Sequence, residues 1–429
     1  MTERLLQYLW QFQYFNRQAL TTTDGQPLAV LAPGLLNTNQ GTDFNQCRIT
    51  IGNTTWAGNI ELHIFSSDWL KHGHQHDGNY QNVILHVVWE HDRAIPDALG
   101  NALPTLELKH RVAKSMLMQY EQWMNTHKQI PCGQGITQVP ELSWKNWLQR
   151  LTIERLMHKH QGIAQHLAQT QNHWEEVFWR ILCRYFGGNV NRTSFEQIAM
   201  GLPIELLAKH KHQIHQLEAL LLGQAGLLHK HFEEQYPRML YREYQYLQKK
   251  YGLRVVNLPP SFLRMRPINF PTVRLAQLAQ LIHQSSHLFA TIKAANTPKD
   301  IEPLLKPTAN DYWHYHYRFD EPTAFLPKQL GTDMYHIITI NAIVPTLFAY
   351  GLHTDNSALK DKALAWLEIL PAEKNSKIAP LTQLGVVPKS AFESQALLQL
   401  KTNWCDAKAC LNCSVGHYLL RQANKNQAL

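Results

Sequence analysis

The sequence lacks long apolar runs. No uninterrupted stretch of about twenty apolar residues occurs in the chain, so we expect no membrane span and no membrane partner. The chain opens with MTERLLQYLWQFQYF, which carries charges in its first positions and no long apolar run, so we expect no secretory signal. Together these absences predict a cytoplasmic protein.

Internal repeats and low-complexity segments are also missing, which excludes repeat architectures. Cysteine is scarce, with 6 residues, and a disulfide framework is not expected in a cytoplasmic protein. Hydrophobic residues make up 44% of the 429 residues, which is enough to form the cores of two or three domains.

Acidic residues are outnumbered by basic ones. The chain has 33 Asp and Glu against 41 Lys and Arg, for a formal net charge of +8. This balance favours a polyanion, and hence nucleic acid, as partner. The 12 Trp and 16 Tyr offer surfaces on which bases can stack, although most aromatic side chains in a chain of this size belong to the core.

The apolar patterning changes near residue 110. Residues 3–18 repeat apolar side chains at helical spacing, which predicts a helix, and periodic segments after 110 predict many more. Short apolar runs separated by turn residues predict five strands, at 27–36, 47–52, 56–65, 82–91 and 104–109. An Asn53-Thr54 turn is expected to join the second and third strands in a hairpin. We therefore expect an α+β protein with a mixed sheet domain over 1–115 and a large all-helical domain over 116–429.

Two acidic residues of the predicted hairpin are placed to share a metal ion. In the strand WAGNIELHIF, Glu61 and His63 project to one face, because side chains alternate along a strand. Asp43 starts the preceding strand, across the hairpin from Glu61. Two carboxylates at one end of a sheet form an oxygen-rich site that suits Mg²⁺ or Mn²⁺.

Such a site suits phosphodiester hydrolysis. The metal neutralises charge on the scissile phosphate and activates a water molecule. His63 lies where it can orient that water or stabilise the developing oxyanion. Gly41 and Gly58 flank the acidic positions, as a close backbone approach to a ligand requires. The predicted catalytic residues are therefore Asp43, Glu61 and His63, with Asp43 and Glu61 as metal ligands.

Asp43 followed by Glu61-Leu62-His63, on a frame of one helix and three strands, resembles the PD-(D/E)XK nuclease superfamily. That family has an Asp on its second core strand and Glu-x-Lys on the third, and here His63 stands in place of the lysine. The resemblance implies a restriction-endonuclease-like sheet domain and a metal-dependent nuclease, that is, a hydrolase.

The loop after this strand adds five candidate ligands for a metal or a phosphate: His72, His74, His76, Asp77 and Tyr80. Its histidines could bind Zn²⁺, with Glu61 or His63 completing a tetrahedral site, and the protein would then be a zinc hydrolase. If the loop instead leads into a helix, His76 and Tyr80 lie on one face and could contact a phosphate. The sequence leaves both alternatives open.

Three cysteines cluster near the C-terminus, in NWCDAKACLNCSVGHYLL: Cys405, Cys410 and Cys413. Three thiolates at this spacing suit Zn²⁺ or an iron–sulfur cluster, and either needs a fourth ligand. Cys132, flanked by Pro131 and Gly133, is the first choice, and His417 is the second choice for a zinc site.

One distant cysteine with three near the C-terminus resembles the iron–sulfur staple of certain DNA exonucleases, namely the CRISPR spacer-acquisition nuclease and bacterial helicase–nuclease subunits. Those proteins also have PD-(D/E)XK cores. The resemblance implies a structural 4Fe–4S cluster that ties the chain ends together, held here by Cys132, Cys405, Cys410 and Cys413.

The segment LRMRPINFPTVRLAQLAQLI carries three arginines that are candidates for nucleic-acid binding: Arg264, Arg266 and Arg274. Arginine side chains can bind phosphate with two parallel hydrogen bonds. Alternatively, these arginines pair with Glu218 or Asp320 and join two parts of the protein.

Taken whole, the chain resembles the family called domain of unknown function 2851. The resemblance rests on GTDF, GNIELHIFSSDW, EALLLGQAGLL, RPINFPTVRLAQLA, LFAYG and the closing CxxxxCLxC. This family implies no particular activity. The leading hypothesis is therefore a metal-dependent nuclease with a structural iron–sulfur or zinc site, and the alternative is a non-catalytic module that binds nucleic acid or protein on a degenerate nuclease fold.

Overall fold

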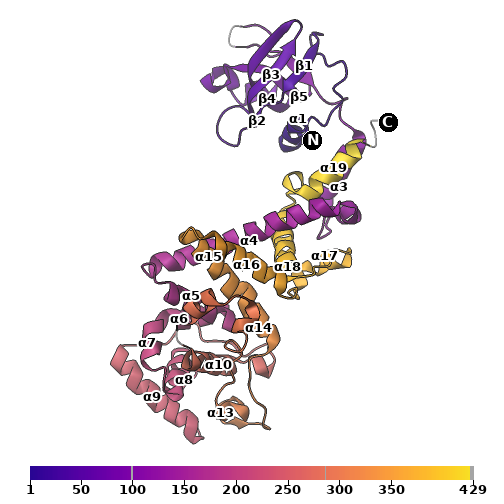
Figure 1. Ribbon diagram of the computed structural model, residues 1–429. Helices are drawn as coiled ribbons and strands as arrows, with labels where there is room; N and C mark the ends of the chain where they lie inside the picture. The colour runs from indigo at the N-terminus through magenta and orange to yellow at the C-terminus, as the bar shows by residue number, and fades with distance from the viewer. Residues whose placement is uncertain (98–99, 286, 426–429) are drawn as a thin grey trace. The chain divides into compact units, whose positions relative to one another are not determined.

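The computed structural model describes residues 1–97, 100–285 and 287–425, and the chain divides into two compact units (Figure 1). The sheet unit comprises residues 1–145, 383–385 and 401–429, and the helical unit comprises 146–382 and 386–400. The sequence predicts a single boundary after residue 115. In the structure the C-terminal cysteine segment instead belongs with the sheet.

The sheet unit is built on a mixed sheet with the strand order β1-β3-β4-β5-β6, in which β2 also pairs with β3. The strands are β1 Leu28–Ala32, β2 Leu35–Leu36, β3 Phe44–Ile51, β4 Thr54–Phe65, β5 Val83–Glu90 and β6 Thr105–Glu107. β3 runs antiparallel to β1 and β4, whereas β5 runs parallel to β4 and β6. All five predicted strand regions are confirmed, and the first of them splits into β1 and β2.

β3 and β4 form the predicted hairpin. Ile51 pairs with Thr54, so the turn is Gly52-Asn53 and not Asn53-Thr54. Gly52 has a φ of +58°, a conformation that glycine adopts without strain. The register shifts between Phe44 and Cys47 at the other end of the hairpin. Such bulges redirect side chains and are frequent beside functional sites.

Helix α1 (Glu3–Gln11) packs against β4 through buried side chains that include Leu6, Leu9 and Trp10. The helix ends at Gln11, short of the predicted end at residue 18. Gln13 has a φ of +54°, which lies outside the right-handed helical region.

A crossover connection links the parallel strands β4 and β5. It contains α2 (Asp68–Lys71) and the single turns η1 (His74–His76) and η2 (Gly78–Tyr80). Trp69 anchors the connection, because its buried ring contacts the rings of His63 and His86 on the two strands. The connection covers the part of β4 that carries the predicted site.

The rest of the sheet unit is helical. α3 (Lys114–Asn125) and α19 (Ser414–Lys425) pack side by side (Figure 1), and Ser115 Oγ donates to the Ala423 carbonyl at 2.8 Å. The short turns are η3 (Gly133–Gln138), η8 (Cys410–Asn412) and the π-helical η7 (Leu400–Cys405).

The helical unit continues α4 (Glu141–Gln169), which begins in the sheet unit. Its other helices and turns are α5 Trp174–Phe186, α6 Arg192–Gly201, α7 Ile204–Lys209, α8 Ile214–Gln224, α9 Gln235–Tyr251, η4 Pro267–Asn269, α10 Pro271–Gln284, α11 Leu288–Ala294, α12 Pro298–Ile301, α13 Asp311–His314, α14 Thr332–Ile338, η5 Thr339–Ile343, α15 Val344–His353, α16 Ser357–Ile369, η6 Ser376–Ile378, α17 Ala379–Gln383 and α18 Ala391–Gln399. The prediction of an all-helical region is wrong in one detail. β7 (His316–Arg318) and β8 (Glu321–Pro322) form an antiparallel ribbon, and Asp320, with a φ of +58°, lies in the turn between them.

The core of the helical unit centres on α8 and α10, which are buried along most of their lengths. A Cβ atom at Gly223 of α8 would lie 2.2 Å from the ring of Tyr244 on α9, so glycine allows these helices to approach closely. The helical run Thr332–His353 is long and apolar enough to cross a membrane by length and composition alone. However, 78% of its most apolar window is buried inside the protein, as in the core helix of a soluble protein.

Candidate functional site

Asp43 and Glu61 interlock across the β3–β4 hairpin. Phe44 pairs with Ile60, so Asp43, the residue before β3, lies beside Glu61. The Asp43 backbone N–H donates to Glu61 Oε2 at 2.9 Å, and Asp43 Oδ2 accepts from the Leu62 backbone N–H at 3.0 Å. The structure therefore brings the two carboxylates together, as the hairpin predicts.

Helix α1 adds two polar side chains to this pair. Gln7 Nε2 donates to Asp43 Oδ1 at 2.7 Å. The carboxylate of Glu3 is close enough to raise the pKa of both Asp43 and Glu61. The sequence predicts no role for Glu3 or Gln7. Glu3 and Gln7 are four residues apart and so lie on one face of the helix. This spacing indicates a role in the site only when the packing of α1 on the sheet is known.

The carboxylate pair is electrostatically unfavourable on its own. Burial raises the pKa of Asp43 to about 6 and that of Glu61 to about 8, and for Glu61 the charge of Asp43 is the second cause. Glu61 is only 6% exposed. At neutral pH the pair therefore favours a bound proton or a bound cation over two unshielded negative charges.

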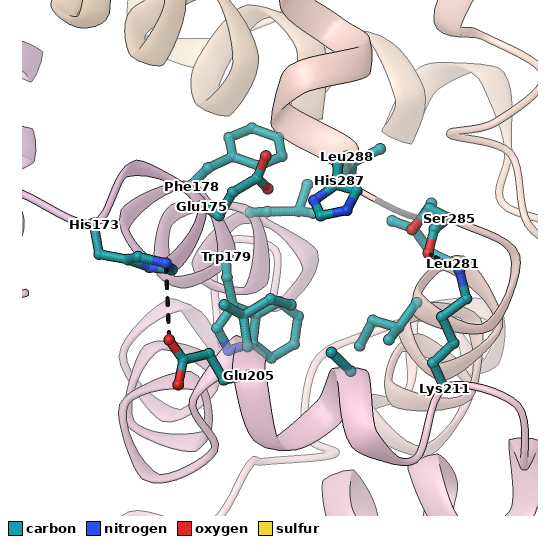
Figure 2. A pocket seen from close by; sticks show the side chains of 14 residues that line it. His173, Glu175, Phe178, Trp179, Glu205, Lys211, Leu281, Ser285, His287 and Leu288 are labelled. Atoms are coloured by element: carbon teal, nitrogen blue, oxygen red, sulfur yellow. Dashed lines mark hydrogen bonds and ion pairs between the residues drawn. The ribbon is translucent and has the colours of Figure 1, made fainter.

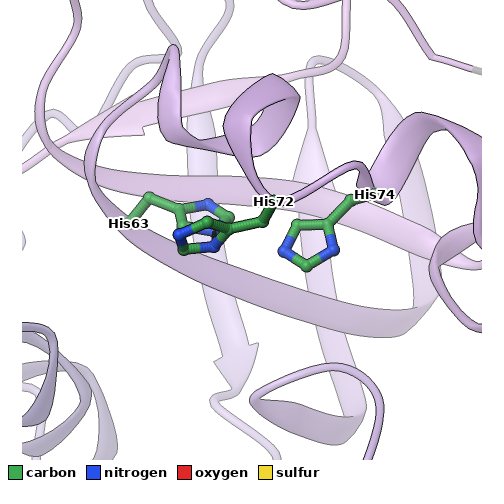
Figure 3. A group of neighbouring side chains, drawn as sticks. All are labelled: His63, His72 and His74. Carbon is green, nitrogen blue, oxygen red and sulfur yellow. Dashed lines mark hydrogen bonds between the residues drawn. The ribbon is translucent and has the colours of Figure 1, made fainter.

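Three imidazoles lie together beside Glu61 on the sheet, and two of them, His63 and His74, face its other oxygen (Figure 3 shows the imidazoles). His63 lies on β4, His72 follows α2 and His74 begins η1, and their ligand nitrogens lie within 4.8 Å of one another. Glu61 Oε1 is 3.6 Å from His74 Nε2 and 3.8 Å from His63 Nε2. One carboxylate and three imidazoles thus converge from β4 and the crossover connection. We call these four residues, together with Asp43, the acid–histidine site.

His86 on β5 extends the site and is a residue to which the sequence assigns no role. It pairs in register with Glu61, and its Nε2 lies 2.8 Å from His63 Nδ1. Side chains alternate between the two faces of β5, and this alternation could identify His86 from sequence. It does so only when the pairing register of β4 and β5 is known.

Three buried or half-buried imidazoles in and beside the site, those of His63, His74 and His86, are held in their neutral form. Burial is the largest cause, and neighbouring imidazoles the next, of a lowered pKa at three of them: His63 to about 2, His86 to about 3 and His74 to about 4. Neutral imidazole is the form that binds metals. His86 Nδ1 and His74 Nε2 are buried and have no hydrogen-bond partner among the residues the structure describes. A metal ion or a water molecule would satisfy them.

Tyr80 completes one side of the site. Its ring stacks on that of His74 with 3.8 Å between centroids, and its hydroxyl donates to the Gly41 carbonyl at 3.3 Å. Burial, followed by the charge of Glu61, raises the pKa of Tyr80 to about 12. Tyr80 is therefore a neutral phenol, and its ring positions His74 by stacking on it.

Asp77 and His76, which the sequence groups with the ligands, lie outside this convergence. Asp77 Oδ1 accepts from the backbone and side chain of Asn79, both at 2.9 Å, and caps η2. His76 is exposed. Two separate short turns replace the single helix that would have placed His76 and Tyr80 on one face.

The two glycines beside the acids have structural causes. Gly41 has a φ of +106°. At Gly58 a Cβ atom would lie 2.5 Å from Ile84 Cγ2 and 2.7 Å from the Asn82 carbonyl oxygen, so glycine is needed for the close packing of β4 on β5. The sequence suggests that these glycines allow the backbone to approach a ligand closely, but this explanation is not needed for either of them.

The donor set fits a borderline divalent ion. Three imidazoles with one carboxylate suit Zn²⁺ or Mn²⁺ better than Mg²⁺, which prefers oxygen ligands and bound water. Glu61 and the three histidines could hold the ion, and Asp43 orients Glu61 through its backbone N–H. The sequence offers a site formed by the loop histidines as an alternative to the site formed by Asp43 and Glu61. In the structure these two sets of residues lie together.

The arginines predicted to bind nucleic acid lie in the helical unit in different settings. Arg264 and Arg266 are exposed. Arg274 is buried and donates to Gln277 Oε1 at 2.9 Å and to Asn269 Oδ1 at 2.5 Å, which is a structural role. The acids expected as alternative partners are used differently. Glu218 accepts from Tyr236, Asn310 and Trp313, and Asp320 accepts from the backbone N–H groups of Glu233 and Glu234.

The helical unit also contains a cavity of about 290 Å³ (Figure 2). Its lining is mainly apolar, and several of its polar groups already have partners in the protein. Glu175 accepts from the backbone of Phe289 and Ala290, and His173 lies 4.0 Å from Glu205. The cavity therefore presents fewer groups suited to catalysis or metal binding than the acid–histidine site does.

All four predicted cysteine ligands lie in the sheet unit: Cys132, Cys405, Cys410 and Cys413. His417, the alternative fourth ligand, is occupied, because its Nδ1 and Nε2 each lie 3.1 Å from a tyrosine hydroxyl, those of Tyr8 and Tyr14.

Comparison with known proteins gives one result. The profile of a family described as "Protein of unknown function (DUF2851)" matches residues 3–376, which confirms the family resemblance and ends before the C-terminal cysteines. No curated protein matches the chain. No solved structure matches it either.

Proposed function

The chain belongs to the DUF2851 family, and we propose that it is a divalent-metal-dependent hydrolase that cleaves phosphodiester bonds of DNA or RNA. One observation carries this proposal. Glu61, paired with Asp43, directs its free oxygen at His74 and His63, whose nitrogens form a close group with that of His72.

Glu61 and the three histidines would hold the metal, which supplies charge neutralisation at the phosphate and a lower pKa for a bound water. His63 is buried and both of its ring nitrogens face other imidazoles, so it acts as a ligand and not as the group that orients water. His72 is exposed and marks the side from which a substrate reaches the site.

The order of elements supports a nucleic-acid substrate. Helix α1 is followed by the long strands β1, β3 and β4 and by a crossover to β5. Asp43 directly precedes the second of these long strands, and Glu61-Leu62-His63 lies on the third. This arrangement is similar to the PD-(D/E)XK pattern of a restriction-endonuclease-like domain. The net charge of +8 also favours a polyanionic substrate.

A second candidate is a zinc hydrolase that acts on a different substrate. It is favoured by the three imidazoles, since zinc in catalytic sites commonly has three protein ligands and one open position. A non-catalytic binding module is the third possibility, and it requires neither the metal nor Glu61.

The test uses the purified full-length chain with Mn²⁺, Mg²⁺ or Zn²⁺ and labelled single- and double-stranded DNA and RNA. We expect cleavage with Mn²⁺, and we expect Glu61→Gln and His74→Ala to abolish both cleavage and tight metal binding. Glu90→Gln and His110→Ala are matched controls, because Glu90 pairs with Lys109 on the same sheet and His110 is exposed. Metal binding without cleavage of any nucleic acid would favour the zinc hydrolase, and equal cleavage by Glu61→Gln would refute the proposal.

A further inference from the structure

The helical unit contains three positively charged side chains that have no acidic partner. Arg155 and Lys159 lie one turn apart on α4, and Arg192 begins α6. All three are half-buried, and none of them forms an ion pair with a residue that the structure describes. Arg150, one turn earlier on α4, shows the contrast, because it pairs with Glu154 at 2.9 Å.

Two amide side chains direct their oxygens at Arg155 and Lys159. On α18, Gln395 Oε1 accepts from Arg155 Nε at 2.7 Å and from Lys159 Nζ at 3.2 Å. On the π-helical turn η5, Asn341 Oδ1 accepts from Lys159 Nζ at 2.9 Å. These hydrogen bonds bring three elements that are distant in sequence together around the two cations.

One carboxylate fixes the orientation of both amides. Glu373 Oε2 accepts from Gln395 Nε2 at 2.8 Å and from Asn341 Nδ2 at 3.3 Å. Its Oε1 accepts from Asn375 Nδ2 at 3.3 Å. An ionised carboxylate only accepts hydrogen bonds, so it turns the amide nitrogens towards itself and the amide oxygens towards the cations. The amides therefore stand between Glu373 and the two cations, which have no direct ion pair with it.

The positive charges of this group disfavour one another. Burial lowers the pKa of Lys159 well below its usual value, and the charge of Arg155 is the second cause. Burial also lowers the pKa of Arg155, an effect that Glu373 opposes and Arg192 reinforces. Three cations with one carboxylate leave an excess of positive charge in a half-buried place, and a bound anion would relieve it.

Several hydrogen-bond donors of the group remain for a ligand. Arg155 uses its Nε, and neither of its terminal nitrogens donates to a described residue. Lys159 uses two of its three N–H groups. Arg192 Nε is buried and has no hydrogen-bond partner within the described part of the chain. A guanidinium fork beside an ammonium group is typical of phosphate binding.

The element that supplies Asn341 points to a functional role independently of charge. η5 is π-helical and lies between α14 and α15 in one helical run. Asn341 Nδ2 also donates to the Ile337 carbonyl at 3.1 Å, so the side chain satisfies a backbone group of this irregular stretch. Single π-helical turns inside α-helices occur frequently at functional sites.

We propose that Arg155 and Lys159 bind a dianionic phosphate group, either inorganic phosphate or the terminal phosphate of a nucleotide. Gln395 and Asn341 are positioning residues, and Glu373 holds them in place. A phosphate monoester carries a charge of about −1.5 to −2 at neutral pH, which balances the excess positive charge better than a carboxylate does. The site lies within the helical unit, and the proposal does not depend on the hydrolase.

The test is thermal unfolding of the metal-free, full-length chain at constant ionic strength. We expect about 10 mM phosphate to raise the melting temperature, because the anion binds the folded protein, and we expect acetate to raise it less. Adenosine monophosphate and a 5′-phosphorylated oligonucleotide distinguish the sources of the phosphate. A response to inorganic phosphate alone identifies the free anion, and a larger response to either of the others identifies a nucleotide. No response to any of the three, or an equal response to acetate, would overturn the proposal.

Lys159→Met removes one charge and keeps the length of the side chain. Phosphate affinity, measured by titration calorimetry, should fall roughly 10–100-fold. Without phosphate the variant should melt at or above the wild-type temperature, because a half-buried cation without an acidic partner is unfavourable. Arg150→Met is the matched control on the same helix and should keep the wild-type affinity. A lower melting temperature for Lys159→Met together with wild-type affinity would show a purely structural lysine and overturn the proposal.

Arg155→Gln covers the case in which Lys159→Met fails to fold. It removes the guanidinium fork and should also weaken phosphate binding roughly 10–100-fold, whereas wild-type affinity in this variant would contradict the proposal. Glu61→Gln should respond to phosphate as the wild type does. This result separates the phosphate site from the acid–histidine site, so the two proposals can fail independently.

Discussion

Glu218 of the helical unit and Glu61 of the sheet unit are both buried, yet their surroundings differ. Glu218 is fully buried and accepts hydrogen bonds from three side chains, Tyr236 at 2.8 Å, Asn310 at 2.8 Å and Trp313 at 3.0 Å. Glu61 accepts one hydrogen bond from the Asp43 backbone, and its other oxygen faces two imidazole nitrogens at 3.6 and 3.8 Å.

The comparison shows that the protein supplies several hydrogen-bond donors to the carboxylate of Glu218 but only one to that of Glu61. Burial raises the pKa of Glu218 to about 7, and all three of its hydrogen-bond donors act against that rise. Burial raises the pKa of Glu61 to about 8, and the nearby Asp43 raises it further. A fully satisfied polar network stabilises a core, whereas a charge left beside like charges is typical of a ligand site. Glu218 is therefore structural, whereas Glu61 favours a bound proton or, as we propose, a bound cation.

The largest effect is expected for Glu218→Ala. This change leaves three buried donors without an acceptor and creates a cavity, so the free energy of unfolding should fall by about 3 kcal/mol or more. Urea unfolding followed by circular dichroism measures the loss. Glu218→Gln keeps the volume and one acceptor oxygen and should cost less. In the metal-free protein Glu61→Gln should not destabilise, and a loss equal to that of Glu218→Ala would contradict the comparison.

A smaller effect separates two histidines of the same loop. His74→Ala removes a proposed ligand and should weaken Mn²⁺ or Zn²⁺ binding by at least the roughly 10–100-fold that loss of a group supporting a ligand costs, as measured by titration calorimetry. His76→Ala, two residues away and exposed, should leave the affinity unchanged. Equal losses for the two variants would mean that the loop binds metal through its general histidine content and not through the geometry of Figure 3.

The acid–histidine site was partly predictable because much of it is local in sequence. Alternation along β4 places Glu61 and His63 on one face, and a two-residue hairpin turn brings Asp43 to them. His86 and Gln7 were not predictable. Their positions depend on the pairing of β4 with β5 and on the packing of α1, which are non-local contacts.

The C-terminal cysteine segment shows the opposite case. The sequence predicts Cys132 as a partner of Cys405, Cys410 and Cys413, because three thiolates leave a tetrahedral set incomplete, and the structure assigns Cys132 to the same unit as these three. The domain boundary after residue 115 could not be corrected from sequence. No change in composition marks where the chain returns from the helical unit to the sheet unit, since α18 and η7 follow each other without a break.

The smallest effect is a pH dependence above pH 7, to which Glu61 should contribute more than Glu218, because the pKa of Glu218 is raised only to about 7. Folding raises the pKa of Glu61 from 4.5 to about 8, so between pH 6.5 and 8 the folded protein keeps a proton that the unfolded chain has lost. Stability therefore falls as the pH rises through this window. Below pH 6.5 the order reverses. Folding lowers the pKa of three histidines, that of His63 to about 2, of His86 to about 3 and of His74 to about 4. The unfolded chain therefore takes up more protons on these histidines than the folded protein retains on Glu61 and Asp43, and stability falls as the pH falls.

The metal-free protein should accordingly have its highest melting temperature near pH 6.5 and lose about 1–2 kcal/mol on going to pH 8. Glu61→Gln should remove most of the decline above pH 7 and keep the decline below pH 6.5, because the histidines are unchanged. Mn²⁺ should flatten the wild-type profile above pH 7, since the cation replaces the proton on Glu61, and should have no such effect on the variant. A wild-type profile that still declines above pH 7 with saturating Mn²⁺ would show that the cation binds elsewhere, and Glu61 would then be a buried carboxylate of the same structural kind as Glu218.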